Sequence, residues 1–130
     1  MYVDIKKLEG YNNIYVVDAF EKEFLTAAGF EHKKYLKNLK SQLYNLERLT
    51  PAQMIKPQFE FLEEIDSFRL FCIRERSKLN LRIIYIYFEN QKIIVLACAF
   101  KEKHKGDYHH AKDVAVKRMK ALKRRLEEIL

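Results

Sequence analysis

Glycine and proline are scarce in this chain, with three Gly and two Pro among 130 residues. This scarcity excludes a collagen-like or low-complexity disordered chain, and the hydrophobic share of 48% is sufficient for a core. No apolar run approaches the length of a membrane span, and the N-terminus lacks the apolar segment of a signal peptide. We therefore expect a cytoplasmic protein, and the length predicts a single domain over residues 1–130.

Motifs for a metal ion, a redox pair or a common nucleophile are also lacking. Cys72 and Cys98 fall within predicted strands and form no CxxC motif, which predicts two buried free thiols. The sequence contains no Ser-His-Asp pattern and no Gly-rich phosphate loop. Some candidate ligands cluster late in the chain without a recognised metal-ligand spacing, namely His104, Asp107, His109 and His110. We expect no metal and no small-molecule cofactor.

Positive charge is abundant and unevenly distributed along the chain. The formal net charge is +7, and residues 101–130 contain ten Lys or Arg against five Asp or Glu. An excess of this size suggests an anionic partner, which includes nucleic acid, the ribosome, an acidic protein and a membrane surface. A basic surface that binds no partner is the alternative interpretation.

Three apolar segments of strand length lie in the middle of the chain, at 68–73, 81–88 and 93–100. They are rich in β-branched and aromatic residues, which is typical of β-strands. The links between them, 75–80 and 89–92, are short and polar. Because a parallel return needs a crossover of about a dozen residues, these links predict an antiparallel three-strand meander.

The first third of the chain predicts a strand followed by helices. Residues 14–17 form a short apolar run that we interpret as an edge strand. Asp18 and Glu21 have the spacing of a capping box, which predicts a helix start, and Gly29 is a candidate helix end or kink. A second helical segment carries an apolar stripe formed by Leu36, Leu39, Leu43 and Leu46.

Two further segments flank the meander. The acidic residues of 63–66 precede it and are interpreted as a solvated loop. Gly106 and Asp107 are expected to break the last strand. Residues 108–130 predict a helix with one apolar face, formed by Ala111, Ala115, Met119, Leu122, Leu126 and Ile129. These elements predict an α+β fold in which a twisted antiparallel sheet packs against N-terminal helices and a C-terminal helix.

The meander carries three motifs in a defined order: 70–74 (LFCIR), 81–88 (LRIIYIYF) and 93–103 (IIVLACAFKEK). In this order they resemble the motifs of the RelE/HigB toxins of type II toxin–antitoxin systems. In that family a strand ending in arginine precedes a strand of the tyrosine-arginine-isoleucine type, and a lysine pair follows the phenylalanine of the third strand. In this chain Glu102 separates the two lysines.

The resemblance implies a RelE-like fold and a specific activity. The implied activity is that of a ribosome-dependent endoribonuclease, an mRNA interferase that cuts mRNA and is neutralised by a cognate antitoxin. The expected partners are therefore the antitoxin, the ribosome and mRNA, with no membrane involved. The resemblance marks four residues of this chain as functional positions: Arg74, Arg82, Lys101 and Lys103.

RNA cleavage through the 2′-OH also suits these residue types on chemical grounds. The hydroxyl must lose a proton, the phosphorane must have its added negative charge balanced, and the 5′-oxygen must gain a proton. Arg74 and Arg82 on neighbouring strands could face one phosphate if the register permits, since arginine binds phosphate in bidentate fashion. A metal-independent catalytic set could be completed around that phosphate by Lys101, Lys103, His104 and Tyr108.

Other interpretations stay open at this point. Arg82 could simply pair with Glu75 or Glu89, and Arg74 could be a charge at a hairpin end. Two alternative functions also suit the pattern. One is a ParE-type toxin, which shares the fold and poisons DNA gyrase without nuclease chemistry; the other is a nucleic-acid-binding domain without toxicity.

Overall fold

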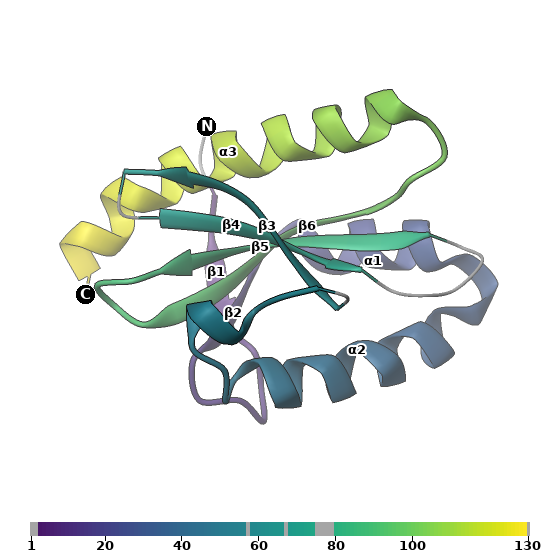
Figure 1. The fold of residues 1–130 in the computed structure, drawn as a ribbon, viewed down its shortest axis with the longest axis horizontal. Coiled ribbons are helices and arrows are strands. Elements are labelled where there is room, and N and C mark those ends of the chain that lie inside the picture. Colours follow the sequence, from purple (N-terminus) through teal and green to yellow (C-terminus); the bar gives the residue numbers. More distant parts are fainter. Residues whose placement is uncertain (1–2, 57, 67, 75–79, 130) are drawn as a thin grey trace.

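The computed structural model (Figure 1) describes residues 3–56, 58–66, 68–74 and 80–129. Its elements follow one another as β1 (Ile5–Lys7), β2 (Ile14–Val17), α1 (Phe20–Ala28), η1 (Gly29–Glu31), α2 (His32–Leu46), η2 (Pro51–Gln53), β3 (Phe59–Ile65), β4 (Phe68–Arg74), β5 (Leu81–Phe88), β6 (Ile93–Lys101) and α3 (Lys105–Ile129), where η marks a 3-10 helix. The six strands form one sheet in the spatial order β1-β2-β6-β5-β4-β3. The fold is therefore α+β, as predicted.

The predicted meander is confirmed, because β4, β5 and β6 pair antiparallel in sequence order. The prediction of a wholly antiparallel sheet is wrong, since β2 pairs with β6 in parallel. The 14–17 strand is confirmed, but β1 pairs with its outer side, so it is not an edge strand. Between β2 and β6 the chain passes through two α-helices, two 3-10 helices and three strands, which supplies the long connection that parallel pairing requires.

The prediction of a solvated loop at 63–66 is wrong for most of that segment, because Phe59–Ile65 forms the edge strand β3. Its aromatic residues hold it on the sheet, since Phe59 is buried and Phe61 packs edge-on against Phe71 with ring centroids 5.5 Å apart. β3 ends before Asp66, whose φ of 54° is typical of a tight hairpin. The acidic residues Glu63 and Glu64 thus belong to a strand and not to a loop.

The predicted α1 helix is present, but the predicted capping box is not. The helix begins at Phe20 after Ala19, which has no side-chain cap, and Asp18 Oδ1 accepts a hydrogen bond only from the neighbouring Ala19 N–H. Gly29 ends the helix as predicted, with a φ of 68° that suits glycine.

The prediction that Gly106 and Asp107 break the last strand is wrong, because β6 already ends at Lys101 and both residues lie in the C-terminal helix α3, which begins at Lys105. Asp107 lies in the first turn of this helix and caps its start. Its Oδ2 accepts hydrogen bonds from the backbone N–H groups of Lys103 (2.8 Å) and His104 (2.9 Å). The bond from the His104 N–H is that of a capping box, in which a side chain of the first turn accepts from the residue just before the helix.

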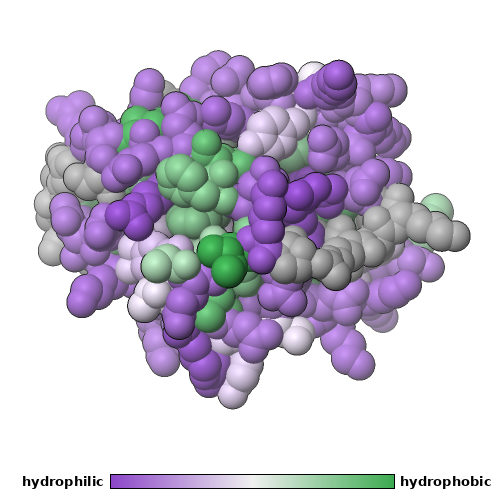
Figure 2. All heavy atoms as spheres, viewed as in Figure 1, coloured by the Kyte–Doolittle hydropathy of each residue, from purple (hydrophilic) through white to green (hydrophobic). Residues whose placement is uncertain are grey.

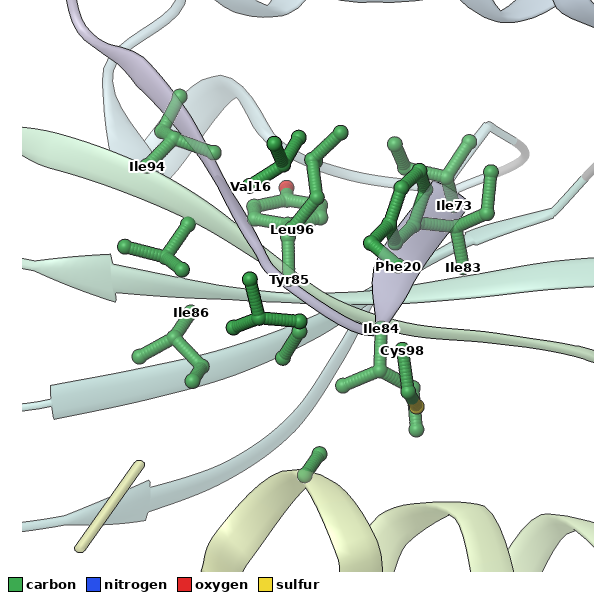
Figure 3. Close-up of a cluster of buried hydrophobic side chains, with 14 of the residues drawn as sticks. Val16, Phe20, Ile73, Ile83, Ile84, Tyr85, Ile86, Ile94, Leu96 and Cys98 are labelled. Carbon is green, nitrogen blue, oxygen red and sulfur yellow. The ribbon is translucent and has the colours of Figure 1, made fainter. Parts of the chain in front are cut away.

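Helices cover both faces of the sheet, with α3 on one side and α1 and α2 on the other (Figure 1). A β-bulge in β6 decides which residues face which helix. Ile84 pairs with Cys98, whereas the next residue, Tyr85, pairs with Leu96, so Ala97 is an extra residue in the strand. Leu96 and Cys98 consequently lie on opposite faces, and Cys98 points toward α3 (Figure 3).

The core contains both thiols, as predicted from the sequence. Cys72 and Cys98 are free and buried, and Cys98 Sγ lies 3.6 Å from the Ala111 carbonyl oxygen of α3. On the opposite side of the sheet, Tyr85 stacks on Phe71 with ring centroids 5.2 Å apart. The outer surface is mostly hydrophilic, but apolar atoms gather in the middle of the face in Figure 2, where β3 crosses in front of the sheet in Figure 1.

Candidate functional site

A row of four charged side chains crosses the sheet at the end that leads into α3. Arg74 and Arg82 occupy its middle, because they are direct partners in the β4–β5 register. Glu60 on β3 and Glu102 just after β6 flank them. Arg82 lies two residues from Ile84, which points toward α3 in Figure 3, so the alternation along the strand places this arginine row on the α3 side.

Each of the two arginines is neutralised by an ion pair with the glutamate on the side away from the other arginine. Arg74 Nη1 lies 3.5 Å from Glu60 Oε2, and Arg82 Nε lies 3.3 Å from Glu102 Oε2. Arg82 Nη1 also donates to the Leu81 carbonyl oxygen at 3.3 Å, and its side chain is only 12% exposed. Like charges directly opposite each other destabilise a sheet, and the two carboxylates relieve that repulsion. An anion that bound between the arginines would do the same.

Tyr108 lies beside the arginine row in the first turns of α3. Burial, and then the charges of Cys72, Glu60 and other nearby acids, raises the pKa of its phenol above the usual value. The phenol therefore keeps its proton at neutral pH and can donate it to a bound oxygen. One turn further along, Lys112 Nζ lies 2.8 Å from Glu63 Oε2 and ties α3 to β3.

Asp107 holds the start of α3 next to the arginine row. The two hydrogen bonds that Asp107 accepts lower the pKa of its carboxyl below the usual value. They also fix the backbone of His104, which is the residue immediately before the helix. Its imidazole is exposed. The positive end of the helix dipole adds to the field of the arginines. Arg74, Arg82 and Tyr108 therefore lie close together on the α3 side, and His104 follows them at the same end of the sheet, just before the helix.

Lys101 and Lys103 are separated from that group. Lys101 lies an odd number of residues from Cys98, so its side chain points to the α1 side of the sheet. Both lysines line a groove of about 430 Å³ beside α1. Of the six residues expected to form one site, the structure brings Arg74, Arg82 and Tyr108 together. It places His104 at the same end of the sheet and the two lysines elsewhere.

The acidic partners of the arginines were not predicted from the sequence. Arg82 pairs with Glu102 rather than with Glu89, which lies 3.4 Å from Arg69 at the other end of the sheet, while Glu75 falls outside the described residues. Glu60 alternates with Phe59 and Phe61, and this period-two pattern was the available signal for a strand with its acid on one face.

A second cleft, the possible metal ligands and the buried Cys72 thiol each give less support for a functional site than the arginine row does. A cleft of about 490 Å³ lies between the sheet and the helices α1 and α2, with apolar walls that include Val16, Phe24 and Leu96. None of the six predicted residues lines it. Within the described ranges, no three His, Cys, Asp or Glu residues are grouped so that they could hold a metal ion. Burial raises the pKa of the Cys72 thiol to about 12, which makes it a poor nucleophile.

Comparison with protein-family models, with curated proteins and with solved structures finds no match to this chain. A search of the described helices for a membrane span finds none that is long and apolar enough. The case for a function therefore depends on the site itself and on the motif resemblance.

Proposed function

We propose that this protein is a RelE/HigB-like toxin with a RelE-like fold, a cytoplasmic mRNA endoribonuclease that acts on the ribosome and is held inactive by a cognate antitoxin. The observation that carries the proposal is the direct cross-strand pairing of Arg74 with Arg82 on the face next to Tyr108. Two guanidinium groups side by side suit a phosphodiester, whose negative charge grows in the transition state.

The proposed reaction needs no metal. The 2′-oxygen attacks the phosphorus, the bond from phosphorus to the 5′-oxygen breaks, and a 2′,3′-cyclic phosphate and a 5′-hydroxyl form. Arg74 and Arg82 balance the charge of the phosphorane, and Tyr108, which stays protonated at neutral pH, gives its proton to the leaving 5′-oxygen. In this proposal His104, at the same end of the sheet, accepts the proton of the 2′-hydroxyl.

The two carboxylates of the arginine row favour one alternative. Because Glu60 and Glu102 already neutralise Arg74 and Arg82, the row has no net charge without a ligand. A protein partner could contact such a row without phosphate chemistry, which suits a ParE-type toxin that binds DNA gyrase. In the nuclease proposal, RNA phosphate replaces one or both carboxylates when it binds.

Induced expression in a bacterium, with growth followed and mRNA 5′-ends mapped, tests the proposal. Wild type is expected to arrest growth and to produce new 5′-ends inside translated messages. Arg82→Ala is expected to abolish both effects. Arg69→Ala is the matched control, because Arg69 is also a strand arginine in ion pairs, at the opposite end of β4. It should retain both effects.

Each alternative function predicts a different result. Growth arrest with intact mRNA would reject the nuclease and support the gyrase-binding toxin. An absence of arrest in wild type would reject toxicity and leave a nucleic-acid-binding domain. Thermal melts of the purified variants keep the comparison valid, since a loss of folding in Arg82→Ala would be visible there. In that case Arg82→Gln, which retains much of the side chain, replaces it.

A further inference from the structure

The outer edge of β6 is covered by another strand along only part of its length. β2 pairs with Ile94, Val95 and Leu96. No other strand in the described ranges continues this pairing toward Lys101. The bulge at Ala97 marks the place where the covering strand stops. The last residues of β6 therefore present a strand edge next to α1.

The backbone groups of this edge point outward. The Glu102 N–H donates to the Asn80 carbonyl oxygen at 3.1 Å, which makes these two residues a hydrogen-bonded pair between the strands. Such pairs alternate with non-hydrogen-bonded pairs along antiparallel strands. Phe100 is thus the next residue bonded to β5, and the peptide groups of Ala99 and Lys101 face away from β5. Both residues line the groove of about 430 Å³ beside α1.

The side chains that line the groove give it a positive charge. Three lysines line it, Lys22 from α1 together with Lys101 and Lys103. Its one acid, Glu23, is neutralised by Arg118 of α3, whose Nη2 lies 2.7 Å from Glu23 Oε2. The groove therefore attracts negative charge.

Arg118 occupies the edge of β6 just before Ala99. Its Nη1 donates to the Ala97 carbonyl oxygen at 2.7 Å, so the bulge is already occupied. An incoming chain has access only from Ala99 onward, which limits the paired segment to a few residues.

The other two edges of the sheet are protected against pairing. β1 is only three residues long and exposes Lys6 and Lys7. β3 contains a register irregularity between Phe61 and Glu63, and Glu63 is ion-paired. Short strands, lysines and bulges are the usual ways in which proteins prevent edge pairing. The β6 edge differs because it lies at the floor of a groove.

We propose that this groove binds a short acidic segment of a partner protein in an extended conformation, which adds as a strand to Ala99 and Lys101. Strand addition satisfies the outward N–H and C=O groups, and alternate acidic side chains of the segment meet the three lysines. This assigns Lys101 and Lys103 to partner binding. The proposal is independent of RNA cleavage, since it involves neither the arginine row nor Tyr108.

The test uses a synthetic fluorescent peptide of eight residues in which Glu and Val alternate. Fluorescence anisotropy with the full chain is expected to show saturable binding. Hydrogen exchange measured by NMR is expected to slow at the amides of Ala99 and Lys101, by about tenfold or more when the peptide is saturating. A matched peptide with Lys in place of Glu is expected not to bind.

Two double variants with the same change in charge separate the groove from the general positive field. Lys22→Glu with Lys103→Glu alters exposed groove residues and is expected to weaken peptide binding by roughly tenfold or more, because attraction becomes repulsion. Lys7→Glu with Lys120→Glu alters exposed lysines outside the groove and is expected to change it by less than about twofold.

Three results would overturn the proposal. The first is an equal loss of binding in both double variants, which would mean charge attraction without a site. The second is undiminished binding of a peptide N-methylated at alternate residues, which lacks the N–H groups for strand pairing. The third is groove-dependent binding of a single-stranded RNA oligomer with no binding of the acidic peptide, which would make the groove an RNA site.

Discussion

Arg74 and Arg82 are direct cross-strand partners, and each forms an ion pair on its other side, Arg74 with a carboxylate of β3 and Arg82 with one just after β6. Glu60 lies 3.5 Å from Arg74, and Glu102 lies 3.3 Å from Arg82. The arrangement puts two like charges in the middle of the row and two opposite charges at its ends. The carboxylates act as competitors for any phosphate that the arginines bind, and this competition can be measured.

Removing one competitor should strengthen RNA binding. Glu102→Gln is expected to raise the affinity for a short single-stranded RNA by roughly two- to fivefold, in line with the ~0.5–1 kcal/mol of a partly exposed ion pair. Fluorescence anisotropy over a range of salt concentrations measures it. Glu89→Gln is the control, because Glu89 pairs with Arg69 outside the arginine row, and its affinity should stay at the wild-type value.

The link from α3 to α1 through Arg118 should contribute measurably to stability. Arg118 is 15% exposed, bonds both oxygens of Glu23, and donates to the carbonyl of the Ala97 bulge. Arg118→Met is expected to lower the free energy of unfolding by about 2–3 kcal/mol in urea titrations, because it leaves partly buried acceptors without a donor. Lys34→Met, which breaks an exposed pair with Glu31, should cost at most about 0.5 kcal/mol.

Neither thiol should react while the protein is folded. Burial raises the pKa of Cys72 and of Cys98 to about 12, so both are protonated at pH 8 as well as shielded from reagents. Labelling with a thiol-specific disulfide reagent should proceed at the rate of unfolding and become fast in urea. Ser41→Cys introduces an exposed thiol on α2 and should react at once. Rapid native labelling of wild type would contradict this burial.

Lys92 adopts a left-handed backbone conformation that suits glycine. Its φ is 55°, and its carbonyl oxygen accepts a hydrogen bond from Asn13 Nδ2, which a substitution leaves in place. Lys92→Gly is expected to raise the free energy of unfolding by about 0.5–1 kcal/mol, which a thermal melt detects. Gly29→Ala makes the opposite change at a φ of 68° and should destabilise the protein. Equal melting temperatures for all three proteins would refute this account of backbone strain.

Asp107 should make stability depend on acid pH. Its pKa is lowered in the folded state, so its contribution is complete above the ordinary value of 3.8 and is lost as the pH falls through the lower folded-state pKa. Asp107→Asn is therefore expected to melt at a lower temperature than wild type at pH 7. The difference should shrink as the pH falls through the folded-state pKa, because protonated Asp107 is neutral, as Asn is. A difference that is constant with pH would mean that the carboxylate charge is not involved.

Local patterns in the chain were enough to predict much of the fold. The apolar segments 68–73, 81–88 and 93–100 are strands, and the helical stripes lie on helices, because side-chain alternation and helical period depend only on neighbouring residues. The strand at 59–65 was missed because its acidic residues suggested solvent, although its aromatic residues already alternated.

Composition and periodicity alone also determined that this is an α+β chain with buried thiols and an excess of positive charge near its C-terminus. The pairing register of the strands, and the face of the sheet on which each side chain lies, were decided only by the tertiary structure. The single extra residue at Ala97 places Lys101 on the face opposite Arg82, and Glu60 reaches Arg74 only because β3 pairs with β4. The physical reason is that strand pairing acts through space: adding one residue reverses every later side chain, and no local pattern records it.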